Sequence, residues 1–252
     1  MGLIFKENKT LIRDYPGETK EISGAVLEAG KKAVQVKLAP FDKFEVEALL
    51  RKLDVMYSSY TNLAISVTVA EEFKNILFAA RMVKEETKNS FGGIHGTGAE
   101  LDVVQLVPAH VGGSILNPAG TASKGLYGGT SAGVTTWLKT FTAATSDDLV
   151  PSQVMSQWAG LVYLGFIDPI EVPKVHLAKF TLSGVPTPPQ PLNFRVREDL
   201  YNYKLPFARL EKPILVGPKK TQAVDVIGGI TGDSKLEPIA IVIAKSEDIA
   251  MV

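Results

Sequence analysis

The chain has 252 residues, 27 basic and 27 acidic side chains, and a net charge of zero at pH 7. Without an excess of positive charge to attract phosphates, we expect no direct sequence-specific binding to nucleic acid. The 45% hydrophobic and 21% charged content is that of a globular protein with a full core, which excludes a disordered or collagen-like chain.

Cysteine is absent, which excludes disulfides, thiolate nucleophiles and zinc–cysteine sites. The first residues, Met1–Lys6, contain no apolar core of signal-peptide length. The longest apolar stretch considered, Leu161–Ile167, has the length of a strand and falls well short of the roughly 20 residues of a membrane span. We therefore expect a protein that is made inside a cell and stays soluble there.

A β-hairpin is predicted in the first 40 residues. Two strand-like segments, Ile22–Leu27 and Ala33–Leu38, flank a turn at Glu28–Lys31. In the second segment aliphatic residues alternate with others, which is typical of a half-buried strand.

Two amphipathic helices are predicted next, because apolar residues recur at helical spacing in two segments. These residues are Val46, Leu49, Leu50 and Leu53 in the first segment and Phe73, Ile76, Leu77 and Ala80 in the second. Thr68 and Glu71 have the spacing of a capping box at the start of the second helix. Between the helices, the alternation within Leu63–Val69 predicts a strand with one buried face.

The segment Asn89–Gly133 is rich in Gly, Ser, Thr and Ala and is interrupted by the apolar run Val103–Val107. Such a composition predicts long surface loops around one or two strands. We expect this segment to lie largely outside the β core and to contact neighbouring subunits.

The last third of the chain reads as short strands separated by Pro and Gly, which predicts a sandwich or barrel. The predicted strands are Lys174–Leu182, Leu192–Arg197, Tyr201–Arg209, Pro213–Gly217, Gln222–Gly228 and Pro238–Lys245. Within the second of them, Leu192, Phe194 and Val196 are expected to face the core.

The sharpest match to a catalytic motif is Gly129–Gly133, which has the G-x-S-x-G pattern of a nucleophile elbow at Ser131 and looks like patatin-type lipases. Asp168 and His176 follow in the order Ser, Asp, His. The elbow requires a buried strand before the serine, whereas Thr121–Gly128 is polar and glycine-rich, and the Asp-Gly pair of patatin-like enzymes is absent. A serine hydrolase using Ser131 is therefore a distant alternative.

Other candidate sites have simpler structural interpretations. The glycine cluster Gly92–Gly98 lacks the Gly-Lys-Ser/Thr ending of a P-loop and predicts a helix end and loop. The histidines, His95, His110 and His176, lack the spacing of metal ligands. The pair Asp147–Asp148 predicts a capped turn or helix. We expect no catalytic residue, no metal site and no cofactor.

Aromatic residues are spread over different predicted elements and are not interleaved with basic residues, as a nucleic-acid platform requires. They include Trp137, Trp158, Tyr163, Tyr201 and Tyr203. Core packing accounts for most of them, and Tyr201 and Tyr203 are candidate anchors at a subunit contact.

The order of strands and prolines after Trp158 resembles the C-terminal strands of jelly-roll capsid proteins from tailless icosahedral viruses. The features that carry the resemblance are Leu164–Phe166, Val175–Leu182, the proline-rich Val185–Pro191, Leu192–Arg197, Leu205–Phe207, Pro213–Pro218, Val224–Val226 and Leu236–Ala244. The resemblance covers roughly the last hundred residues. It implies a mainly β, antiparallel sandwich of jelly-roll type, with the two short helices inserted near the N-terminal half.

The expected organisation is a single domain over residues 1–252, with a helical insertion at about 42–86 and a loop region at about 89–133. The function that the resemblance implies is a self-assembling capsid protein located in the virion. Its partners would be copies of itself, with other virion proteins or an internal membrane between shell and genome. The second hypothesis is a ligand- or carbohydrate-binding β-sandwich module.

Overall fold

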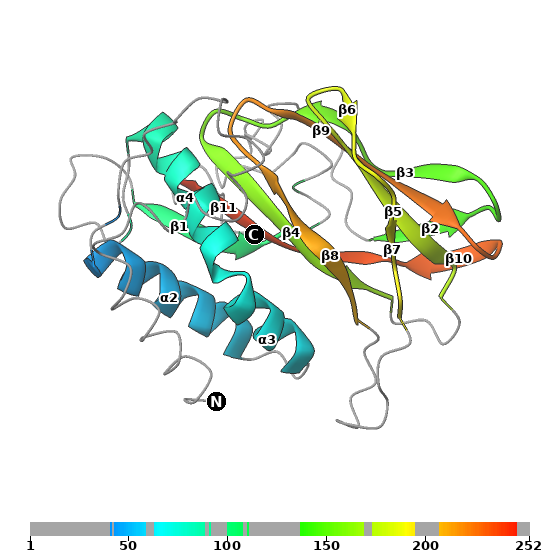
Figure 1. Cartoon of the computed structure of the whole chain (residues 1–252), viewed down its shortest axis with the longest axis horizontal. Coiled ribbons are helices and arrows are strands. Elements are labelled where there is room, and N and C mark those ends of the chain that lie inside the picture. The colour runs from blue at the N-terminus through cyan, green and yellow to red at the C-terminus, as the bar shows by residue number, and fades with distance from the viewer. Residues whose placement is uncertain are drawn as a thin grey trace, which may run out of the picture.

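Two large antiparallel sheets, a third sheet of two strands and a layer of helices make up the structure, a computed structural model (Figure 1). It describes residues 41, 43–58, 63–88, 91, 100–107, 110, 137–168, 173–194 and 207–245. The helices are α2 (Lys43–Ser58), α3 (Leu63–Glu71) and α4 (Phe73–Thr87). The strands are β1 (Leu101–Gln105), β2 (Leu138–Phe141), β3 (Ser146–Val154), β4 (Ala159–Ile167), β5 (Val175–Leu182), β6 (Val185–Pro186), β7 (Gln190–Pro191), β8 (Phe207–Val216), β9 (Thr221–Gly228), β10 (Gly232–Lys235) and β11 (Glu237–Lys245).

The strands pair in a nested order. β1 pairs with β11, β2 with β10, β3 with β9, β4 with β8, and β5 with both β6 and β7, and every one of these pairs is antiparallel. This is the pairing of one long hairpin. The hairpin is rolled up so that β11 also joins β4 and β9 also joins β5, which gives the sheet orders β1-β11-β4-β8 and β3-β9-β5-β6. The predicted jelly-roll sandwich is confirmed.

The sheet β1-β11-β4-β8 is the middle layer, because the helices cover one of its faces and the second sheet covers the other. Its two central strands, β4 and β11, are therefore buried on both sides. In β11 the larger residues Ile239, Ile241 and Ile243 pack toward the helices, while Ala240 and Val242 pack toward the second sheet. A strand with two buried faces reads as a continuous apolar run.

Both predicted helices are confirmed as α2 and α4, but the strand predicted at Leu63–Val69 is wrong. That segment forms α3, which is separated from α4 by the single residue Glu72. Its alternating aliphatic residues also contain the helical spacing i, i+4, and Ile65, Val69 and Phe73 are all buried on that spacing. The capping box is wrong as well, since Thr68 lies inside α3 and no side chain caps the start of α4.

Most of the C-terminal strands are confirmed, with two corrections. Two segments predicted as separate strands, Tyr201–Arg209 and Pro213–Gly217, contribute to a single strand, β8. Leu192–Phe194 follows β7 without forming a strand. Leu192 and Phe194 are nevertheless buried in the core, as predicted. Residues 195–206, including Val196, Tyr201 and Tyr203, lie outside the described residues.

The N-terminal hairpin also lies outside the described residues, as does most of Asn89–Gly133. The described part of that segment contains β1, whose Leu101 and Val103 are buried against the helices. Asp147 and Asp148, predicted to cap a turn or helix, both lie in β3, and the carboxylate of Asp147 accepts a hydrogen bond of 3.4 Å from the backbone N–H of Thr142 in the preceding turn.

Gly165 lies where β4 and β8 of the middle sheet leave no room for a side chain. The register between β4 and β8 shifts between Tyr163 and Gly165. A methyl group at position 165 would lie 2.5 Å from the carbonyl oxygen of Ala208 and 2.5 Å from the Phe207 ring. Backbone cannot move aside without breaking the pairing of the two strands.

We predict that Gly165→Ala lowers the free energy of unfolding by about 3 kcal/mol, the upper range for overpacking a core. Urea denaturation measures this. Gly217→Ala is the matched control, because its added methyl would meet the flexible end of Met82 at 3.2 Å. Equal stability of the two variants would contradict the close approach of β4 and β8.

Candidate interaction site

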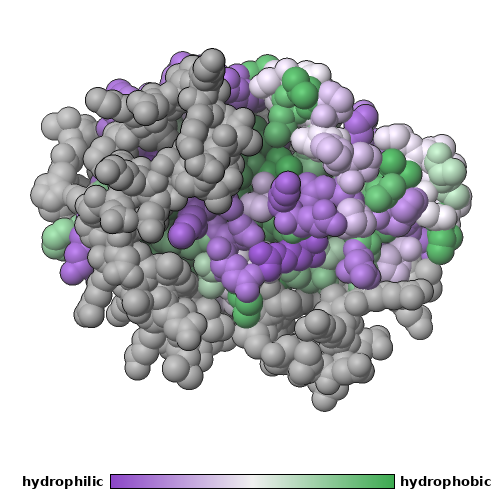
Figure 2. Space-filling model, in the orientation of Figure 1, coloured by the Kyte–Doolittle hydropathy of each residue, from purple (hydrophilic) through white to green (hydrophobic). Residues whose placement is uncertain are grey.

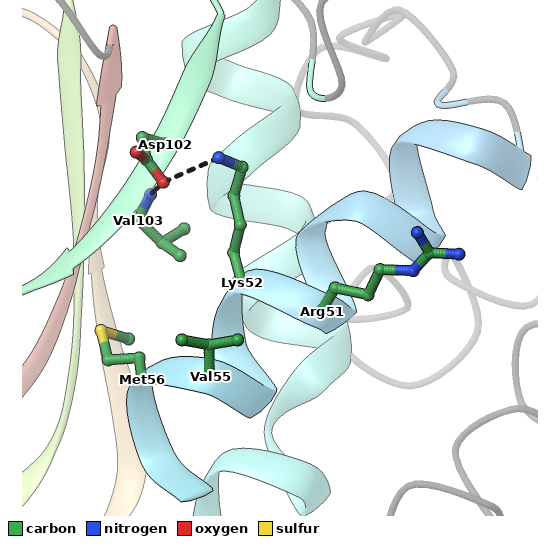
Figure 3. Close-up of a pocket in the computed structure, with 6 residues that line it drawn as sticks. All are labelled: Arg51, Lys52, Val55, Met56, Asp102 and Val103. Atoms are coloured by element: carbon green, nitrogen blue, oxygen red, sulfur yellow. Dashed lines mark hydrogen bonds and ion pairs between the residues drawn. The ribbon is translucent and has the colours of Figure 1, made fainter. Parts of the chain in front are cut away.

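A shallow groove lies between α2 and β1, the strand at one edge of the middle sheet (Figure 3). Its volume is about 300 Å³. The residues that line it are Arg51, Lys52, Val55, Met56, Asp102 and Val103. Three of these six are apolar, so the groove combines an apolar surface with a charged border.

An ion-pair network forms the charged border. The ammonium nitrogen of Lys52 lies 3.1 Å from Oδ1 of Asp102 and 3.1 Å from Oε1 of Glu100. Burial alone would lower the pKa of Lys52, but the hydrogen bonds and charge attraction to Asp102 and Glu100 outweigh that effect, so the pKa is raised. This network joins α2 to β1.

The outer edge of β1 is occupied by side chains. The backbone N–H of Leu106 donates to the carbonyl oxygen of Ala240 in β11, so the backbone groups of the odd-numbered β1 residues point the other way. On that outer side, the N–H of Val103 donates to Oδ1 of Asp102 at 2.8 Å. Tyr57 of α2 donates its hydroxyl to the side chain of Gln105, which reaches inward to the carbonyl oxygen of Pro238 in β11. Charged and polar side chains at an edge oppose pairing with a foreign strand.

The outer face of α2 carries two large exposed apolar side chains. Phe44 is 69% exposed and Val55 is 74% exposed. Arg51 lies between them in the sequence, and in Figure 3 its side chain points away from β1. The pattern that could have revealed this surface was present in the sequence: two large apolar residues on the polar side of an amphipathic helix.

A second surface is polar. Figure 2 shows hydrophilic side chains gathered over the middle of the face where β8 crosses Figure 1. The exposed residues of β8 include Arg209, Glu211 and Lys212. Arg209 is anchored there by Glu71 and Glu72, from the helical layer. This surface therefore belongs to the junction between the sheet and the helices.

Of Ser131, Asp168 and His176, the residues of the hydrolase alternative, the structure describes Asp168 and His176. Asp168 is completely buried and accepts a hydrogen bond of 2.6 Å from the hydroxyl of Ser234 in β10. His176 is exposed in β5, and its ring packs beside Gly229. Ser131 lies outside the described residues, as do Gly92–Gly98 and its His95.

His110 has a structural environment. Its side chain is 2% exposed, and Nδ1 accepts a hydrogen bond of 3.1 Å from the backbone N–H of Val107. Its own backbone N–H donates to the carbonyl oxygen of Val107. Burial lowers the pKa of His110 to about 4, so the neutral ring is the form that closes this turn.

Within the described ranges, no group of three or more His, Asp or Glu side chains is arranged to hold a metal ion. None of the described helices is long and apolar enough to cross a membrane.

No protein-family model matches this chain, and no curated protein matches it. Among solved structures, a similarity of 14% identity and TM-score 0.24 was found to dimeric latent PorU from Porphyromonas gingivalis. That similarity covers 60% of this chain and 13% of the other.

We predict that His110 makes the protein less stable in mild acid. The pKa is about 4 in the folded chain and 6.5 in the unfolded chain, so only the unfolded chain gains a proton between these values. The contribution of His110 to the free energy of unfolding is complete above the pKa of the unfolded chain and is lost as the pH falls toward the pKa of the folded chain. Between about pH 7 and pH 5 the loss is about 2 kcal/mol.

Urea denaturation of the wild type and of His110→Gln at both pH values measures this contribution. The variant should lose less stability on acidification than the wild type does. His176→Gln is the control, because that side chain is exposed. Parallel pH profiles for the wild type and His110→Gln would refute the assignment.

Proposed function

We propose that this protein is a structural, self-assembling protein and that it forms the shell of a virion. The observation that carries the proposal is the nested strand order, which makes the sandwich a jelly roll. Jelly rolls are used by viral capsid proteins, as well as by lectin domains and cupins.

The layered architecture supports this function. The helices and the second sheet leave the molecule with two different broad faces, one helical and one formed by β3, β9, β5 and β6. Along β9, every second residue is buried and the others are only partly covered, so the outer side of that sheet is accessible. In a closed shell, symmetry repeats the same orientation of every subunit. A subunit with two distinct faces and a middle layer buried on both sides suits that arrangement.

The partners in this proposal are copies of the chain itself. Other virion proteins or an internal membrane are compatible further partners, since the net charge of zero gives no electrostatic basis for coating a genome directly. The proposal includes no enzymatic activity.

The first test of this function is assembly. The purified protein should form symmetric multimers or closed shells, because a shell protein must bury large repeated surfaces between subunits. Light scattering coupled to size-exclusion chromatography gives the mass, and electron microscopy gives the shape. A ligand-binding β-sandwich module predicts a monomer instead, and a monomer at every concentration and salt condition would refute the shell proposal.

The second test addresses the hydrolase alternative. A fluorophosphonate probe should leave Ser131 unlabelled, because a serine reacts only when a base and an exposed elbow activate it. Mass spectrometry of the treated protein reads this out, with Ser131→Ala as the control. Stoichiometric labelling at Ser131 that disappears in the variant would establish a reactive serine and contradict the absence of enzymatic activity.

A further inference from the structure

The two exposed apolar side chains of α2 lie on one stripe of the helix. Phe44 and Val55 are eleven residues apart, which is about three turns and about 16 Å along the axis. The opposite side of α2 is buried, with Leu49, Leu53 and Tyr57 almost inaccessible. The stripe therefore faces away from the core of its own subunit.

The groove beside this stripe offers a place for an aromatic ring. It is about 300 Å³ in volume, and its apolar lining comes from Val55, Met56 and Val103. One end of the stripe is thus a projecting ring at Phe44, and the other end borders a groove at Val55. A surface that carries both a projection and a matching recess can bind a copy of itself.

We propose that the occupant of this groove is a second copy of the chain. Helix α2 packs antiparallel against α2 of the second copy around a two-fold axis, and Phe44 of each copy enters the α2–β1 groove of the other. The inference rests on the proposed function, since it names one contact of the self-assembly.

The residues between Phe44 and Val55 are complementary in this arrangement. Antiparallel packing that brings Phe44 opposite Val55 also places Ala48 opposite Arg51 and Glu47 beside Arg51, while Lys52 stays on the flank that faces β1, paired with Asp102 and Glu100. An acidic residue thereby meets a basic one, and the two-fold axis repeats each contact. The small side chain of Ala48 lies near the crossing point, which permits the close approach of about 8–10 Å between helix axes.

Contacts within one subunit leave Glu47 able to take part. Its ion pair with Lys43 is 4.0 Å long, and both side chains are substantially exposed. An exposed pair of this kind contributes little. The side chain of Arg51 extends away from β1, on the outer side of α2 (Figure 3).

The edge of β1 favours docking through side chains over the addition of a strand. Asp102 already accepts the outward N–H of Val103 and is paired with Lys52. A strand added to this edge would have to displace that carboxylate. A phenyl ring entering the groove leaves the network in place and covers it, which strengthens its charge interactions by excluding water.

The first experiment compares Phe44→Ala with Phe78→Ala by sedimentation velocity of the unassembled protein. Phe78 is the matched control, because it is an aromatic residue on α4 that is also exposed, at 38%. A contact of this size is a weak one, so protein concentrations up to roughly 100 µM are needed. We expect the wild type and Phe78→Ala to dimerise equally, and Phe44→Ala to dimerise at least about tenfold more weakly.

The second experiment tests the charge pairing between copies. Glu47→Arg gives a stripe with only basic charges, and Arg51→Glu gives one that is more acidic. Each variant alone should be largely monomeric because like charges meet across the axis, whereas an equimolar mixture should form a heterodimer. A contact within one helix cannot produce this rescue by mixing.

The outcomes separate this inference from the shell proposal. A wild type that stays monomeric, a Phe44→Ala variant that dimerises like the wild type, or a mixture that fails to associate would overturn the α2 contact. Shells that form normally from Phe44→Ala would overturn the contact and leave the shell proposal intact. Dimers that are lost in Phe44→Ala, with no larger assembly of the wild type, would support the contact and refute the shell.

Discussion

The structure depends on the burial of one sheet from both sides. β4 and the interior of β11, from Pro238 to Ala244, have no face left for solvent, so their residues are apolar, aromatic or small, and the two layers they separate must both be complete. Burying one valine, leucine or isoleucine side chain contributes about 1.5–3 kcal/mol to stability. The unequal division of β11, with Ile toward the helices and Ala and Val toward the second sheet, adapts each face to a different neighbour.

Close packing and ion pairs hold the helical layer on this sheet. A methyl group at Gly160 of β4 would lie 2.8 Å from the side chain of Val83 in α4, so helix and strand approach at the limit of contact. The ammonium of Lys84 binds both carboxylate oxygens of Glu45, at 2.6 and 2.7 Å, and ties α4 to α2. Glu45 is almost fully buried, so removing Lys84 alone would leave a buried charge without its partner and would lower stability strongly. The position of α2, and hence of the groove beside β1, follows from these contacts.

Local patterns predicted the elements where period and burial agree. α2 and α4 have one apolar face each, and β9 alternates strictly between buried and partly exposed residues, so their patterns were unambiguous. Leu63–Val69 was misassigned because a short aliphatic run satisfies both periods, and only contact with the core decides between them. The hairpin turn after β5, by contrast, follows from local conformation alone. Ser183 and Gly184 both have positive φ, as a tight turn between adjacent strands requires.

The candidate site could not be predicted from the sequence because its parts lie far apart along the chain. Lys52 and Asp102 are 50 positions apart and meet only when α2 is laid over β1. Residue order along the chain also carries no information on burial: Asp168 precedes His176 in the order of a catalytic triad, and the fold buries Asp168 against Ser234.

The same arrangement makes the proposed assembly through α2 compatible with a stable subunit. The buried side of α2 packs in the core, and its outer side presents the exposed side chains of Phe44 and Val55, which the proposed contact would cover. The edge of β1 carries charges that discourage unspecific strand pairing. In the proposed assembly, an apolar stripe beside a protected strand edge would direct association to one geometry, and self-assembly requires that selectivity because every copy presents every surface at once.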